Sequence, residues 1–153
     1  MRNKKHFYLL PIMIILVFIT IIKYEPPKFE YPDIEVDSKM QIYLPYYIPK
    51  DYKLGEFNVD RPFVSISFEN ESQTIWYTQI HTGGSFSFTT DTEHHKITEY
   101  ESEKFSGYLS ESIKYPEDYA LYIFDDNNYY EISGTIDKHE LFKIAESIEK
   151  YIP

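Results

Sequence analysis

The chain opens with a run of apolar residues that no charge interrupts. Residues 7–22 read FYLLPIMIILVFITII, and the nearest charged residues on either side are Lys5 and Lys23. As a helix, the run would span about 24 Å, slightly less than a hydrocarbon core of about 30 Å. His6 and the long stem of Lys23 extend it at both ends. The pattern predicts a transmembrane helix at 7–22, preceded by a short tail at 1–6.

Two interpretations of this run remain, an uncleaved membrane anchor and a cleaved secretory signal. Cleavage needs small residues just after the apolar run. After the run, no Ala, Gly or Ser occurs before Ser38, and Pro26 and Pro27 stand where cleavage would be expected. The anchor is therefore favoured. The chain has no Cys, which excludes a lipid-modified cysteine.

The charges around the run predict its orientation. Residues 2–5 read RNKK, whereas acids predominate over bases between Lys23 and Lys39. By the positive-inside rule, the tail at 1–6 should lie in the cytoplasm and the remainder outside the cell. We expect a single-pass protein of the cell membrane with an extracellular C-terminal domain.

Residues 23–39 contain three prolines and no hydrophobic periodicity. Such a composition is typical of a stiff, partly extended spacer, and we interpret the segment as a linker. An alternative is that Phe29, Tyr31, Ile34 and Val36 lie along the domain as an edge strand.

Beyond residue 40 the pattern changes to short runs in which apolar and polar residues alternate, as in half-buried strands. Strands are expected at 64–68, 73–81, 86–89, 96–100, 107–113, 119–124 and 129–133. Gly83-Gly84 is a hairpin signal. The run at 119–124 is apolar on both faces, which predicts a place inside the sheet.

The last segment has the period of a helix. Asp137 can cap it, and Glu140 follows at the spacing of a capping box. The apolar positions share one face: Leu141, Ile144, Ala145, Ile148, Tyr151 and Ile152. Glu146 falls on the opposite, solvent-facing side. Because such a stripe must be buried, we expect an α+β fold at 40–153, an antiparallel sheet with one C-terminal helix packed on it.

Composition narrows the chemistry. The absence of Cys rules out disulfides, thiolate nucleophiles and zinc–sulfur sites. The net charge is −10, from 15 basic and 25 acidic residues. The first 23 residues carry four bases and no acid, so the remaining 130 residues hold 11 bases and 25 acids, a net charge of −14. An acidic domain repels phosphate backbones, so we expect no nucleic-acid partner.

Three groups of polar residues were candidates for catalysis or metal binding. His94 and His95 are adjacent, so in a strand they point to opposite faces and rarely reach one ion. The sequence DDNN at 125–128 lacks the spacing of a calcium loop and indicates a hairpin turn. We therefore predict neither a metal nor a cofactor. The acids Glu99, Glu101, Glu103 and Glu111 could supply paired carboxylates for glycoside cleavage, although alternating acids are typical of a solvated strand.

Tyrosines are the remaining unusual feature, with 16 in the chain beside 11 phenylalanines. Such side chains are enriched in binding surfaces, but they also build the core of a thin sheet whose hydroxyls reach water. For a binding surface, the part of the sheet that the helix leaves uncovered is the expected place. The candidate ligand-binding residues there are Tyr77, Tyr122 and Tyr130.

Three stretches resemble the family called domain of unknown function 4367. They are LPYYIPKDYKLGEF at 44–57, VSISFENESQTIWYTQI at 64–80 and ALYIFDDNNYYEISGTIDKHELFKIAESI at 120–148. The sequence departs from the family pattern at Phe124, where Trp is common, and at Asp51, where Gly is frequent. The resemblance implies an extracytoplasmic α+β domain of Gram-positive bacteria, and fold-level analogy adds that its sheet is curved.

These observations together predict a membrane-anchored, non-enzymatic binding domain outside the cell. Some members of the family resemble envelope-regulatory or sporulation-related proteins, so the expected partners are membrane lipid around the N-terminal helix and an envelope protein or the cell wall. The alternative is a small extracellular cell-wall hydrolase that uses carboxylates.

Overall fold

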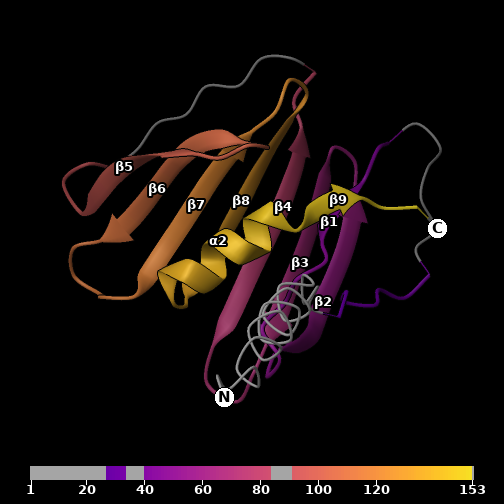
Figure 1. The fold of residues 1–153 in the computed structure, drawn as a ribbon, viewed down its shortest axis with the longest axis horizontal. Helices are drawn as coiled ribbons and strands as arrows, with labels where there is room; N and C mark the ends of the chain where they lie inside the picture. The colour runs from indigo at the N-terminus through magenta and orange to yellow at the C-terminus, as the bar shows by residue number, and fades with distance from the viewer. Residues whose placement is uncertain (1–26, 34–39, 84–90, 153) are drawn as a thin grey trace, which may run out of the picture.

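The computed structural model describes residues 27–33, 40–83 and 91–152, which form one sheet, one helix and a short strand pair (Figure 1). The elements are β1 (Tyr43–Pro45), β2 (Lys53–Asp60), β3 (Phe63–Glu69), β4 (Thr74–His81), β5 (His95–Glu101), β6 (Ser106–Ser112), β7 (Asp118–Phe124), β8 (Asn128–Thr135), α2 (Lys138–Glu146) and β9 (Ile148–Lys150). The predicted transmembrane helix and the expected strand at 86–89 lie outside the described residues. No helix within the described ranges has the length and apolar character needed to cross a bilayer.

The main sheet has seven strands in the order β2-β3-β4-β8-β7-β6-β5. Every adjacent pair is antiparallel. The predicted antiparallel sheet with one helix near the C-terminus is confirmed, and β7 lies inside the sheet as expected. Strand β4 pairs with β3 along one edge and with β8 along the other.

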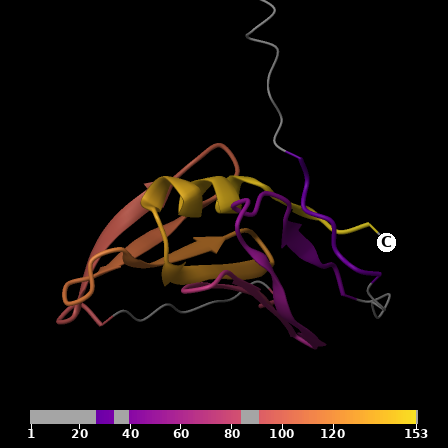
Figure 2. The ribbon, with the colours of Figure 1, turned by 90° about the horizontal axis from the view of Figure 1, so that it is seen from below.

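Helix α2 packs on one face of this sheet (Figure 2). A cross-strand row of buried residues, Ile66, Tyr77, Ile132 and Leu121, runs across that face. From the helix, Leu141, Ile144 and Ala145 are fully buried. At the β5 edge, the ring of Tyr100 stacks on that of Phe142 of the helix, 5.0 Å between centroids, so the sheet curves toward the helix there.

The helix begins where the sequence indicates. The Asp137 side chain accepts hydrogen bonds from the backbone N–H groups of His139 and Glu140. The Glu140 carboxylate accepts from Lys143 Nζ at 2.6 Å and from the Tyr47 hydroxyl, rather than reaching back to Asp137 as in a capping box. The start of α2 is therefore tied to the segment after β1 as well as to its own cap.

The helix ends earlier than the apolar stripe predicts. It stops at Glu146, and Ile148 is buried from β9, which pairs with β1. Ile152 is 78% exposed, so its expected place on the buried stripe is wrong. The cause is a contact with a segment far away in the sequence: the backbone carbonyl and the hydroxyl of Ser147 accept hydrogen bonds from Tyr46 N–H and Tyr47 N–H. Pairing with β1 thus replaces the next helical turn.

The expected solvent position of Glu146 is also wrong. The Tyr100 hydroxyl donates to Glu146 Oε1 over 2.7 Å, and the Lys104 ammonium donates to the Glu146 backbone carbonyl over 2.5 Å. The carboxylate is half-buried. Because β5 curves toward the helix, this face of α2 meets a strand instead of water.

Part of the expected linker lies along the domain. Phe29 N–H donates to the Tyr46 carbonyl, and the Tyr31 hydroxyl donates to the Pro45 carbonyl. The ring of Phe29 packs edge-on against Phe68, 5.4 Å between centroids. Phe29 and Tyr31 thus lie along the domain, but no strand is assigned at residues 27–33. Residues 34–39 lie outside the described ranges.

Candidate functional site

The sheet face opposite α2, here called the outer face, carries large exposed side chains. Phe63 is 47% exposed, Trp76 44% and Tyr108 37%. Side chains alternate along a strand, and residues paired across strands share a face. Trp76 pairs with Ser67 and Ser133, so all three point away from the helix. Aromatic rings exposed on a sheet face are typical of contact surfaces.

A second set of aromatic rings crosses the outer face between β6 and β8. The ring of Tyr122 stacks on Tyr129 at 6.2 Å, and Phe124 lies 5.6 Å from Tyr129. Tyr108 packs edge-on against Phe124 at 6.3 Å. The rings support one another in these geometries, so this part of the face is held in a fixed shape.

Carboxylates lie among these rings. Glu131 pairs with Thr78 on one side and Tyr122 on the other, and its Oε2 accepts from the Tyr129 hydroxyl over 3.1 Å. Burial raises the pKa of the Tyr122 and Tyr129 phenols, and the Glu131 carboxylate raises both further. The phenols therefore remain neutral donors near this acid.

Of the three candidate tyrosines, only Tyr122 lies on the outer face, where it is half-buried. Tyr77 and Tyr130 are fully buried on the helix-covered face and stack on each other at 6.5 Å. Their hydroxyls donate to the Tyr43 carbonyl at 2.7 Å and to Asp125 Oδ2 at 2.6 Å. Both are core residues, which agrees with the interpretation that the tyrosines build the core of the sheet.

The sequence interpretation missed Trp76 and Phe63. Alternation along QTIWYTQI at 73–80 shows that Trp76 and Tyr77 point in opposite directions. It does not show which of the two faces the helix. The sequence therefore shows that one of the two residues is on the uncovered face. The structure shows that this residue is Trp76 and not Tyr77.

The candidate acids do not form an opposed pair. Glu99 and Glu101 are exposed on the outer face of the edge strand β5, beside Tyr108 and Ser106. Glu111 pairs with Tyr119 and Lys96 on the helix-covered face. Glu103 lies in the exposed turn between β5 and β6. These four carboxylates therefore do not have the geometry of a glycosidase pair, in which two acids flank one bond.

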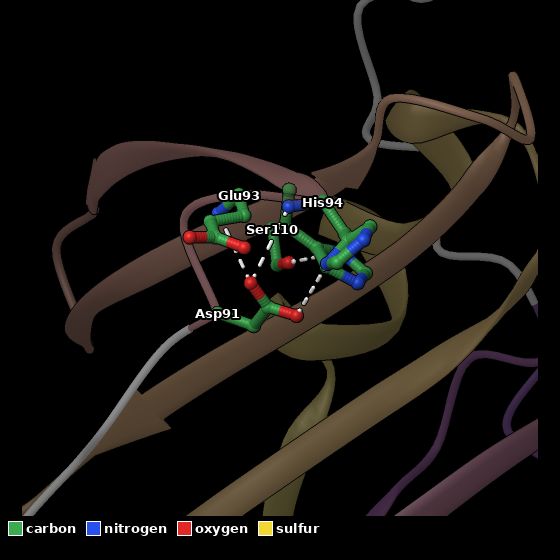
Figure 3. A network of polar contacts seen from close by, with 5 residues as sticks. Asp91, Glu93, His94 and Ser110 are labelled. Atoms are coloured by element: carbon green, nitrogen blue, oxygen red, sulfur yellow. Dashed lines mark hydrogen bonds and ion pairs between the residues drawn. The ribbon is translucent and has the colours of Figure 1, made fainter.

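His94 and His95 bond different partners (Figure 3). His94 Nδ1 lies 2.8 Å from Asp91 Oδ2, and His95 Nδ1 lies 3.0 Å from Ser110 Oγ. The hydrogen bond from His94 lowers the pKa of Asp91 below its ordinary value. Asp91 Oδ1 also accepts from the Glu93 N–H, so this cluster shapes the turn before β5. Across the described ranges, no three His, Asp or Glu side chains are grouped so as to hold a metal ion.

The turn at 125–128 contains a polar network that the sequence did not indicate. Gln79, fully buried, accepts from Tyr43 N–H at 2.8 Å and donates to Asn128 Oδ1 at 3.1 Å. Asn128 in turn donates to the carboxylate of Asp125. Tyr43, Asp125 and Asn128 of this network line a hollow together with Gln41 and His81. It joins β1 to β4 and β8, and this structural role explains its buried polar groups.

The described residues define an α+β fold, in which one helix covers one face of a seven-stranded antiparallel sheet. The chain matches a family described as Domain of unknown function (DUF4367) over residues 42–148. This match covers most of the chain, so the protein belongs to that family. It runs from the residue before β1 to the first residue of β9, and so includes the whole sheet and helix. No curated protein matches the chain.

Proposed function

We propose that the protein is a membrane-anchored domain outside the cell that binds a partner through the outer face of its sheet. The observation that carries the proposal is the exposure of Phe63 and Trp76 on that face. Burial of large exposed aromatic side chains by a partner contributes favourably to the binding free energy. Trp is also enriched among residues that dominate binding.

The charge of the outer face supports a partner that is basic as well as apolar. From β4 to β5, the described strands place Glu99, Glu101 and Glu131 on this face and neither Lys nor Arg. A cation can contact both a carboxylate and the face of an aromatic ring. The partner class that fits is a basic polypeptide segment with apolar side chains, such as an exposed segment of an envelope protein.

The membrane anchor is supported by the uncharged run at 7–22 and by the basic residues before it. A tether at the membrane raises the effective concentration of any partner in the same envelope. A moderate affinity at the outer face is then sufficient for function.

A binding role without catalysis is favoured over the hydrolase because the candidate acids are not opposed. Glu99 and Glu101 lie on one strand, and Glu111 lies on the other face. Incubating the full chain with cell-wall glycans tests this point. Turnover that disappears in Glu99→Gln or Glu101→Gln would contradict the binding role and favour the hydrolase.

The single Trp of the chain provides a direct probe, because Trp76 is the only residue of its kind. The full chain in detergent should be titrated with a peptide that alternates Lys and Leu, and with a matched peptide of Glu and Leu. We expect the basic peptide to change the Trp76 emission saturably, and salt to weaken the effect. An equal response to both peptides would contradict the proposed partner class.

A further inference from the structure

The two edges of the main sheet differ in how well they are protected. The strand at one edge, β2, has an irregular register between Leu54 and Phe57, which interrupts its pairing with β3. The strand at the other edge, β5, is regular, and each residue of His95–Glu101 pairs with one of Ser106–Ser112. Within the described part of the chain, no strand pairs with the outer side of β5. Bulges blunt an edge, whereas a regular edge is open to a further strand.

The hydrogen bonds at both ends of β5 show which backbone groups point outward. Ile113 N–H donates to the His94 carbonyl, and Ser102 N–H donates to the Phe105 carbonyl. In an antiparallel pair the bonded positions alternate, so Lys96, Thr98 and Tyr100 bond β6. The N–H and C=O groups that point away from the sheet belong to the odd positions: His95, Ile97, Glu99 and Glu101.

We propose that β5 pairs antiparallel with β5 of a second copy of this chain, with Thr98 opposite Thr98. This register places Glu101 opposite His95, Glu99 opposite Ile97 and Lys96 opposite Tyr100. In this register no two like charges lie opposite each other. Each of the two Glu101–His95 pairs places a carboxylate opposite an imidazole. Opposite partners of this kind stabilise a sheet, whereas like charges destabilise it.

Other registers are less favourable. The outward groups occur at every second residue, so the strands can slide only in steps of two. A slide in one direction brings Glu99 opposite Glu99. A slide in the other direction leaves Tyr100 and Glu101 of each strand without an opposite residue in β5, because Glu93 lies in the turn before the strand. The register centred on Thr98 is therefore favoured, because it alone pairs all of His95–Glu101 and opposes no like charges.

The edge strand is already held in place for such pairing. Tyr100 is fixed from the helix side by Phe142 and by its hydrogen bond to Glu146. An antiparallel pair of identical strands has a two-fold axis perpendicular to the sheet, so both helices lie on the same side. The two outer faces then form one continuous surface. The inference is independent of the proposed partner, because it rests on the edge and not on the outer face.

The absence of Cys permits a sharp test. Directly opposite residues of a non-bonded antiparallel pair have Cα atoms about 4.5 Å apart, within the range of a disulfide. The full chain carrying Thr98→Cys in detergent should form a disulfide-linked dimer under mild oxidation. The control is Asn58→Cys, a single exposed cysteine on the opposite edge strand β2. If Thr98→Cys crosslinks no faster than Asn58→Cys, the inference is overturned.

A second pair of variants tests whether the outward backbone groups make the contact. Glu99→Pro removes an outward N–H and leaves the bonds to β6 intact, as edge positions allow. Glu99→Ala removes the same carboxylate and keeps the N–H. Combined with Thr98→Cys, the Pro variant should reduce crosslinking to the level of the Asn58→Cys control, and the Ala variant should retain it. Equal crosslinking by the two combined variants would contradict pairing through β5. The protease resistance of each variant is measured as well, to verify that the variant is folded.

Discussion

Removing one buried hydroxyl tests whether Tyr130 belongs to the core. Its hydroxyl donates to Asp125 Oδ2 over 2.6 Å, and its side chain has no exposed surface. Tyr130→Phe keeps the ring against Tyr77 and removes only this bond. A hydrogen bond to a charged group contributes about 1.5–3 kcal/mol. Because Asp125 is exposed and water can replace the donor, we expect the free energy of unfolding to fall by about 1–2 kcal/mol.

The loss should depend on pH. Burial acts to raise the pKa of Asp125, but hydrogen bonds from Tyr130 and from the backbone N–H groups of Asn127 and Asn128 lower it below its ordinary value. A carboxyl with a lowered folded pKa stabilises the fold above the unfolded pKa of about 3.9, and this stabilisation is lost as the pH falls through the folded pKa. In the variant the folded pKa moves back toward the ordinary value. The difference between the two proteins should therefore be largest at neutral pH and shrink in acid.

Denaturant titration of both proteins at neutral pH and at about pH 3 measures the effect. Tyr115→Phe is the matched control, because Tyr115 is 58% exposed, and its loss should stay within about 0.5 kcal/mol. Equal stability of Tyr130→Phe and the original chain at neutral pH would refute the core assignment. A loss that is unchanged by acid would show that Asp125 is not the partner that matters.

Three further predictions concern packing and topology. Ile148→Ala should lower the free energy of unfolding by about 2–5 kcal/mol and Ile152→Ala by less than about 0.5 kcal/mol, as measured by denaturant titration; similar losses would contradict the end of the helix at Glu146. Gly107→Ala should lower the melting temperature strongly, since the added Cβ would lie 1.9 Å from the Tyr122 carbonyl oxygen, whereas Ser106→Ala should leave it nearly unchanged. Protease added to intact protoplasts should digest the domain, and a domain that stays protected or is released in soluble form would argue against the anchor.

The strands could be predicted because half-buried strands leave an alternating pattern. Val64, Ile66 and Phe68 alternate with Ser65 and Ser67, and the strand β3 follows them. The start of the helix could also be predicted, because an N-cap residue such as Asp137 bonds backbone N–H groups in the first turn after it. Both signals depend on residues that are close together in the sequence.

The end of the helix and the placement of the tyrosines depend on residues far apart. Helix α2 stops because Ser147 bonds the segment after β1, about a hundred residues earlier. Which face of β4 the helix covers depends on the whole sheet, so Tyr77 and Trp76 could not be distinguished from their alternation alone. The buried Gln79 has no local signal, because its partners Tyr43 and Asn128 come from separate strands.

The most direct test of the central claim is a calorimetric titration of the full chain and its variants with the basic Lys–Leu peptide. Trp76→Ala removes an aromatic ring from the outer face, and Tyr115→Ala removes an exposed ring from the turn between β6 and β7. We predict that Trp76→Ala weakens binding about fivefold or more, since truncated anchor residues cost more than about 1 kcal/mol, while Tyr115→Ala leaves the affinity unchanged. Equal affinities of the original chain and Trp76→Ala, with the variant folded, would contradict binding at the outer face.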